Sequence, residues 1–181
     1  NYSQLKVGNY WIYQQFNFDA YGNVTPTSFY DSCYIEKDTI VNGKTYFKMF
    51  RPGYLGTNPI SFLRDSLHYL VNLEGKILFS SQDFTSVLNS YFIKATATDT
   101  VCQVNLQMKD KALNYTSPAG NFITSNAVET FNMFPRWIGS GNPRYKQTRY
   151  AESIGIIMET LPFFASNRDY VERRLVRYHL N

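Results

Sequence analysis

The stretch that decides the fold runs from Asp38 to Phe47 and reads Asp-Thr-Ile-Val-Asn-Gly-Lys-Thr-Tyr-Phe. Its centre, Asn42 and Gly43, stands between two runs of residues that favour β-strands. A two-residue type I′ turn requires positive φ at both central positions, and Asn followed by Gly tolerates that best. The stretch therefore predicts a β-hairpin with Asn42 and Gly43 as its loop.

This turn fixes a register for the two strands. The expected pairs are Val41–Lys44, Ile40–Thr45, Thr39–Tyr46, Asp38–Phe47, Lys37–Lys48, Glu36–Met49 and Ile35–Phe50. Because side chains alternate between faces, Lys37 and Lys48 lie opposite each other, which is unfavourable in a dry core. We therefore expect the other face to point inward; it carries Tyr34, Glu36, Asp38, Ile40, Thr45, Phe47 and Met49.

Further short β-forming segments, separated by Gly, Pro and Asn, occur along the whole chain. The segments expected as strands include 10–18, 29–41, 44–50, 61–64, 67–71, 76–79, 91–98, 100–106, 122–133, 145–151, 155–161 and 170–180. Residues 107–112 are expected as a turn, and 80–90 as a loop or the chain's one short helix. The pattern predicts an all-β fold: a single domain over residues 1–181, built as an antiparallel open barrel or sandwich of about ten strands.

Composition limits the function classes. Aromatic residues make up 17% of the 181 residues, and charged residues only 18%, below the usual quarter. The aromatic content favours ordinary sheet packing, with a stacking surface for sugars or other ligands as the alternative. The net charge of +4 is concentrated from Arg136 onward, where eight of the 18 basic residues but only four of the 14 acidic ones lie. This asymmetry favours a solvated strand face over an anionic partner, and no nucleic-acid motif is present.

The two cysteines, Cys33 and Cys102, are too few for a disulfide scaffold and lack the spacing of a zinc site. We expect them to be buried free thiols, with a single disulfide as the alternative. No metal and no cofactor is expected.

A loop over residues 135–143 carries the candidate binding residue, Trp137. Arg136, Arg144 and Lys146 flank it, and Trp and Arg are enriched at protein interfaces. The four residues are therefore a candidate binding site for a partner. The alternative is that Trp137 folds back as a plug over one end of the sheet.

Catalytic motifs are missing from the sequence. Ser66, His68 and Asp65 are near neighbours in one expected strand, where adjacent side chains point to opposite faces and cannot converge. The other histidine, His179, lies at the far end of the chain. Glycan hydrolysis by two carboxylates stays open as an alternative, with Asp65, Asp83, Asp99 and Glu129 as candidates. We expect that the protein is not an enzyme.

Several segments carry a resemblance to a known group of proteins. They are Leu-Lys-Val-Gly-Asn-Tyr-Trp (5–11), Lys-Asp-Thr-Ile-Val-Asn-Gly-Lys-Thr-Tyr-Phe-Lys (37–48), Phe-Leu-Arg-Asp-Ser (62–66), Leu-Phe (78–79), Asp-Phe (83–84) and Ser-Ile-Gly-Ile-Ile (153–157). In this order they resemble uncharacterised exported proteins of Gram-negative bacteria, many of them lipoproteins. The resemblance implies an exported protein of the periplasm, outer membrane or cell surface, with a signal peptide and any lipid-carrying Cys upstream. It carries over no functional residues. The late Gly-containing strand is also loosely similar to open-barrel carriers of lipoproteins in the periplasm, an analogy of fold alone.

These observations predict a non-catalytic, monomeric cell-envelope protein that binds an apolar or amphiphilic ligand, or an envelope protein, on a curved β-sheet. An upstream lipid anchor would attach it peripherally to the membrane. The alternatives are a glycan-acting hydrolase and a purely structural domain of a surface protein.

Overall fold

The computed structural model of the chain describes residues 1–19, 21–52, 59–138, 142–162 and 170–181. Within these residues there are twelve strands and one 3-10 turn, η1. The strands are β1 (Tyr10–Phe18), β2 (Val24–Val41), β3 (Lys44–Phe50), β4 (Ile60–Ser66), β5 (Tyr69–Asn72), β6 (Ile77–Ser80), β7 (Asn89–Lys94), β8 (Thr100–Ser117), β9 (Gly120–Met133), β10 (Arg144–Ala151), β11 (Gly155–Pro162) and β12 (Tyr170–His179); η1 spans Pro135–Trp137.

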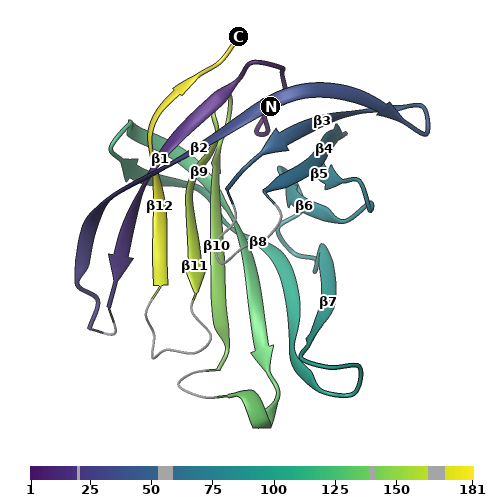
Figure 1. Cartoon of the computed structure of the whole chain (residues 1–181), viewed down its shortest axis with the longest axis vertical. Helices are drawn as coiled ribbons and strands as arrows, with labels where there is room; N and C mark the ends of the chain where they lie inside the picture. Colours follow the sequence, from purple (N-terminus) through teal and green to yellow (C-terminus); the bar gives the residue numbers. More distant parts are fainter. Residues whose placement is uncertain (20, 53–58, 139–141, 163–169) are drawn as a thin grey trace.

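All twelve strands belong to one antiparallel sheet in the order β6-β5-β4-β3-β2-β1-β12-β11-β10-β9-β8-β7. The first strand pairs with the last, so the two edges of the sheet are β6 and β7. The sheet curls until β6 comes near β8 and β9, which makes a nearly closed barrel (Figure 1). The predicted all-β antiparallel fold is confirmed, with twelve strands where about ten were expected. Of the two predicted forms, open barrel or sandwich, one continuous curled sheet corresponds to the barrel. In the described part of the chain, no helix is long and apolar enough to cross a membrane.

The β2–β3 hairpin confirms the predicted turn and only part of the predicted register. Asn42 and Gly43 have φ of 50° and 72°, as a type I′ turn requires. Pairing follows the prediction from Val41–Lys44 to Lys37–Lys48, and then a bulge shifts it. Beyond the bulge, the observed pairs are Ile35–Met49 and Tyr34–Phe50, so the predicted pairs Glu36–Met49 and Ile35–Phe50 are wrong.

The same bulge corrects the predicted inward face. An extra residue reverses the alternation of side chains beyond it, so Ile35 is buried and Tyr34 is exposed. Met49 is buried as predicted. Ile40 is 74% exposed because the tip of this hairpin projects beyond the barrel (Figure 1). The acidic residues Glu36 and Asp38, which the prediction placed inside, are exposed.

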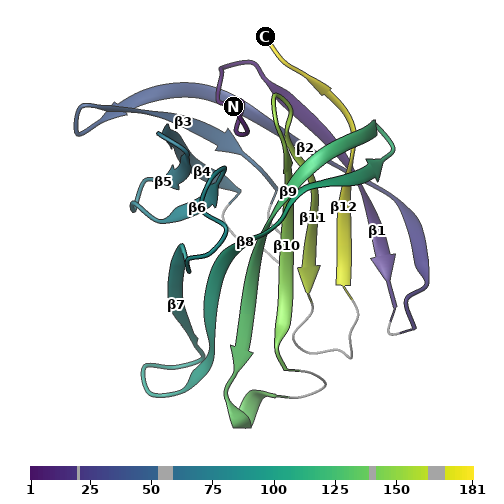
Figure 2. The ribbon, with the colours of Figure 1, turned by 180° about the vertical axis from the view of Figure 1, so that it is seen from behind.

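The β8–β9 hairpin replaces the turn that was predicted over residues 107–112. Asp110 and Ala112 adopt positive φ in a bulge, and β8 continues through them to Ser117. The far end of the hairpin reaches across to β12 (Figure 2). There Tyr115 Oη donates a hydrogen bond of 2.5 Å to Glu172 Oε1. The bulge therefore bends the long hairpin so that its far end packs against β12.

Two segments of the family resemblance meet in the core. Trp11 is 1% exposed, and its Nε1 donates a hydrogen bond of 2.7 Å to the carbonyl oxygen of Ile154. Gly155 has φ of 104°, and a Cβ there would lie 3.3 Å from Trp11 Nε1. The start of β1 and the start of β11 therefore form one packing unit that requires glycine at this position.

Both cysteines are buried and unpaired, as predicted. Cys33 belongs to the larger hydrophobic cluster with Trp11, whereas Cys102 belongs to a second cluster with Val104 and Phe131. Burial raises the pKa of the Cys33 thiol to about 11, which keeps it protonated and unreactive at neutral pH.

Candidate functional site

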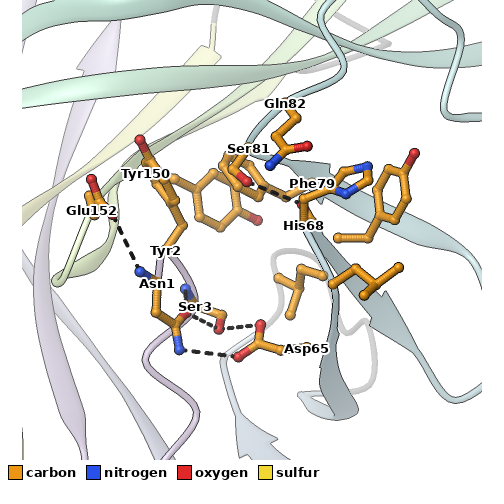
Figure 3. Close-up of a pocket in the computed structure, with 13 residues that line it drawn as sticks. Asn1, Tyr2, Ser3, Asp65, His68, Phe79, Ser81, Gln82, Tyr150 and Glu152 are labelled. Atoms are coloured by element: carbon orange, nitrogen blue, oxygen red, sulfur yellow. Dashed lines mark hydrogen bonds and ion pairs between the residues drawn. The ribbon is translucent and has the colours of Figure 1, made fainter.

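A pocket of about 630 Å³ lies where the N-terminal segment meets the β4–β5 turn, the end of β6 and the β10–β11 turn (Figure 3). We call it the mouth pocket. It is lined by Asn1, Tyr2, Ser3, Asp65, Leu67, His68, Tyr69, Leu70, Phe79, Ser81, Gln82, Tyr150 and Glu152. The lining therefore comes from segments far apart in the sequence, which only the curled sheet brings together.

Aromatic rings form the deep wall of the mouth pocket. Phe79 and Tyr150 are 3% and 5% exposed, and their ring centroids lie 4.4 Å apart. The half-buried ring of Tyr2 packs against Phe79 with a centroid distance of 5.1 Å. Burial raises the pKa of Tyr150 to about 12, so its hydroxyl stays protonated and able to donate a hydrogen bond. Contiguous rings of this kind offer an apolar surface with a polar edge.

Polar groups form the rim of the mouth pocket. The Asp65 carboxylate accepts hydrogen bonds from Ser3 Oγ at 2.5 Å and from Asn1 Nδ2 at 3.3 Å. Across the pocket, Glu152 forms an ion pair of 3.5 Å with the amino group of Asn1, and its side chain is 65% exposed. Leu67, in the β4–β5 turn, is 96% exposed with φ of 57°, an unfavourable conformation for a residue of this type. An apolar side chain is therefore held in solvent at the pocket's edge.

A second polar group lies inside the barrel and is fully paired. We call it the interior ionic cluster; it consists of Asp31, Arg51, Glu129, Lys146, Glu159 and Arg173. At its centre, Glu159 lies 2.6 Å from Arg51, 3.4 Å from Lys146 and 3.7 Å from Arg173. Arg51 follows β3, and Glu159 is in β11, four strands away in the sheet order. Their contact therefore crosses the interior of the barrel.

The other two carboxylates of the cluster complete its charge balance. Glu129 lies 2.9 Å from Lys146 and accepts a hydrogen bond of 3.1 Å from Tyr91 Oη. Asp31 Oδ2 lies 2.7 Å from Arg173 Nε, a close contact without the alignment of a hydrogen bond. The cluster contains three cations and three carboxylates, so it has no net charge with which to attract a ligand.

The cations of the cluster decide the ionisation of Glu159. Burial on its own would raise the pKa of this carboxyl, but Arg51, Lys146 and Arg173 outweigh burial and lower it. Likewise, Glu159 and Glu129 raise the pKa of Lys146 against the effect of burial. A glycosidase acid needs a raised pKa. Glu159 therefore has the electrostatics of a structural ion pair.

The predicted carboxylates lie at separate places. Asp83 accepts hydrogen bonds from the main-chain nitrogens of Thr85 and Ser86, and such bonds lower its pKa. Asp99 binds the loop after β9, Glu129 belongs to the interior ionic cluster, and Asp65 lines the mouth pocket. Among the described residues, no group of three or more His, Cys, Asp or Glu side chains could hold a metal ion.

The structure brings together two of the four predicted binding residues, Arg136 and Trp137. Both bind Asp99: Arg136 by an ion pair of 3.0 Å and Trp137 by a hydrogen bond of 3.1 Å from Nε1. The Trp137 ring is half-buried against the cluster that contains Cys102. Lys146 belongs to the interior ionic cluster. The neighbouring glycines, 139 and 141, lie outside the described residues.

Arg144 is half-buried in β10, opposite Phe131 of β9. That these four residues bind a partner stays a prediction.

Sequence reasoning missed most of the mouth pocket. Phe79 and Tyr150 were predicted only as strand residues, and Tyr2 and Glu152 were given no role. A local pattern could not identify them, because each is an ordinary strand or turn residue. Only the pairing of β1 with β12 and the curl of the sheet place them side by side.

No protein-family profile and no curated protein matches the chain. Two solved structures are similar over nearly the whole length. One is a "putative exported protein with YmcC-like fold" from Bacteroides fragilis, with 12% identity, 98% of each chain covered and a TM-score of 0.44. The other is a "putative lipoprotein" from Parabacteroides distasonis, with 11% identity, 98% of this chain and 97% of that chain covered, and a TM-score of 0.43.

Proposed function

We propose that this protein is a non-catalytic, monomeric binding protein of the bacterial cell envelope that holds a small amphiphilic ligand in the mouth pocket. The observation that carries the proposal is the pocket itself: about 630 Å³, with a buried aromatic wall and a polar rim. Ligand sites in proteins are concave, have volumes of about 300–1,000 Å³, and combine apolar walls with a few polar groups.

Two features favour a small molecule over a protein partner at this site. The deepest side chains, Phe79 and Tyr150, are less than 6% exposed, so a flat protein surface would not reach them. A further void of about 20 Å³, lined in part by Ser3, Leu70 and Tyr150, adjoins the pocket beneath the N-terminal segment. The apolar part of a ligand would meet the aromatic wall of the mouth pocket, and its polar part would meet the rim.

The envelope location rests on the sequence motifs that resemble exported proteins and lipoproteins. The structure explains two of them as one unit, because Trp11 of the first motif packs on Gly155 of the last. Attachment to a membrane would come from a lipid-carrying cysteine upstream of residue 1.

The test measures the affinity of the protein for a neutral naphthalene alcohol, with the fluorescence of the probe as the signal. Gln82 is exposed and lines the pocket, so Gln82→Trp fills the pocket without removing a core contact. We expect at least tenfold weaker binding and a melting temperature within about 2 °C of the original, as for other surface substitutions. The matched control is Lys94→Trp, an exposed position of β7 outside the pocket. Equal affinity of the two variants for the probe would overturn the proposal.

Glycan hydrolysis is the second candidate, because the mouth pocket contains two carboxylates, Asp65 and Glu152. Retaining and inverting glycosidases both need such a pair across the scissile bond. Release of reducing sugar from envelope glycans by the original protein, abolished in Asp65→Asn, would favour the enzyme. The binding proposal expects no release from either protein.

A further inference from the structure

We infer that the mouth pocket selects organic cations: its ligand carries an ammonium group beside an apolar body. This inference rests on the proposed function and specifies the chemistry of the ligand. The juxtaposition that carries it is of two rim carboxylates, Asp65 and Glu152, with the aromatic rings of Tyr2, Tyr69, Phe79 and Tyr150 in one pocket.

The first argument is the charge of the lining. Two carboxylate side chains line the mouth pocket, and no Lys or Arg is among its lining residues in the described part of the chain. The amino group of Asn1 lies 3.5 Å from Glu152 and offsets one of the two charges, whereas Asp65 is hydrogen-bonded by neutral groups. The protein as a whole has a net charge of +4, so the pocket is an acidic site on a basic molecule. Long-range attraction would not bring a cation to this protein, and selection must therefore come from the local groups.

The second argument concerns the partners of Asp65. Its hydrogen bonds come from the Ser3 hydroxyl and the Asn1 side-chain amide, which are both neutral. These donors orient the carboxylate and leave its negative charge in place. In the interior ionic cluster, by contrast, Glu159 lies within 3.7 Å of three cations. The charge of Asp65 is thus open to a cation that comes from solution.

The third argument is the aromatic wall. A cation is attracted to the face of an aromatic ring within about 6 Å of its centre, and several rings around one site make a cage for quaternary ammonium groups. The rings of Tyr2, Phe79 and Tyr150 are contiguous, with centroid distances of 5.1 and 4.4 Å. Tyr69 packs against His68 on the β4–β5 side of the same pocket. Phe79 and Tyr150 are almost fully buried, so an ammonium group would contact the half-buried rings of Tyr2 and Tyr69 together with a carboxylate.

The experiment uses three naphthalene probes that differ only in the head group: trimethylammonium, hydroxyl and sulfonate. At low salt, we expect the trimethylammonium probe to bind about tenfold more tightly than the alcohol, and the sulfonate at least tenfold more weakly. High salt should shrink the first ratio to about threefold, because mobile ions screen charges at an exposed rim. A ratio of one or less between cation and alcohol would overturn the inference.

The double variant Asp65→Asn, Glu152→Gln removes both charges and keeps the shape of the side chains. We expect the preference for the cation over the alcohol to fall to about twofold or less. The control is Glu36→Gln, an exposed acid of β2 outside the pocket, which should keep the tenfold preference. A preference that persists in the double variant would overturn the role of the carboxylates.

The same probes separate the inference from the proposed function. If the alcohol binds and Gln82→Trp weakens it, the pocket is a ligand site whatever the charge series shows. If the alcohol binds and the cation binds no better, the cation inference alone fails. If no probe binds at all, both fail.

Discussion

The interior ionic cluster and the mouth pocket both contain carboxylates of the same curled sheet, but the carboxylates differ in whether cations of the protein pair with them. Glu159 is nearly buried and lies within 3.7 Å of Arg51, Lys146 and Arg173. Asp65 is exposed, and its hydrogen bonds come from neutral donors. The first carboxylate has its charge neutralised by the protein, and the second does not.

This difference separates structure from recognition. A buried charge must be paired, because removal from water costs several kcal/mol per ion. A pair that crosses the barrel, such as Arg51 with Glu159, joins the segment after β3 to β11, and β3 and β11 are not neighbours in the sheet. A charge at the rim can stay unpaired at little cost and is available to a ligand. Variants in each region should therefore affect different measurements.

The largest expected effect is on the central carboxylate of the interior ionic cluster. Glu159→Gln keeps the shape of the side chain but leaves three cations, the buried Arg173 and the half-buried Arg51 and Lys146, with two carboxylates. Breaking a buried ion pair typically costs about 3–5 kcal/mol, and we expect a loss of unfolding free energy in that range. Urea denaturation at pH 7 measures it. A loss below about 1 kcal/mol would show that water reaches the cluster and that the cluster contributes little to the stability of the fold.

The same variant has a distinct pH dependence. Since the folded protein holds the pKa of Glu159 below its ordinary value of 4.5, the unfolded chain takes up the proton first as pH falls. The stability contributed by Glu159 is present above that value and is lost as pH falls through the folded pKa. Below about pH 5, the original protein should lose stability more steeply than Glu159→Gln. Parallel curves would contradict the lowered pKa.

The β2–β3 hairpin and residues 107–112 show what a local sequence pattern can and cannot predict in this fold. Asn42-Gly43 has one favoured turn geometry, and the pairing near it followed directly. The prediction failed where a bulge added one residue near Glu36, since nothing in that stretch marks the insertion. Residues 107–112 failed for the same reason: polar residues suggested a turn, and Asp110 adopts positive φ within a continuous strand.

The site was less predictable than the fold, because its chemistry is distributed. Glu159, Arg51 and Lys146 lie in three separate segments: Glu159 and Lys146 look like ordinary strand charges, and Arg51 follows an expected strand. Sequence reasoning used Lys146 as a surface cation, but it lies between Glu129 and Glu159. Pairing across a barrel depends on how the sheet curls, and alternation along one strand does not determine that.

The loop after β9 provides the next test, because Trp137 there could stabilise the fold or bind a partner. Its ring is half-buried, and its Nε1 binds Asp99, which also pairs with Arg136. We expect Trp137→Ala to lower the unfolding free energy by about 2–3 kcal/mol through lost packing and a lost hydrogen bond. A melting temperature that stays the same, together with lost capture of an envelope protein, would instead establish Trp137 as an anchor.

The β2–β3 hairpin tip gives a baseline, because it belongs to neither region. Gly43 has φ of 72° with no atom near its missing Cβ, so the cost of Gly43→Val is backbone strain alone. We expect a loss of about 1–3 kcal/mol, with almost none for the neighbouring Lys44→Thr. Thermal unfolding of both variants checks this. Equal melting temperatures would show that the tip does not maintain the turn in solution.

The smallest expected effect on stability is in the mouth pocket. The double variant Asp65→Asn, Glu152→Gln removes two carboxylates, of which Asp65 is held only by neutral donors and Glu152 is 65% exposed. Its unfolding free energy at pH 7 should stay within about 0.5 kcal/mol of the original, as is usual for surface positions. The Asn side chain can still accept from Ser3, which preserves the contact of the N-terminal segment with β4. A loss of several kcal/mol, comparable with that of Glu159→Gln, would mean that Asp65 fastens this segment as a structural element. The contrast between the two regions would then fail, and with it the argument that the mouth pocket keeps its charge for a ligand.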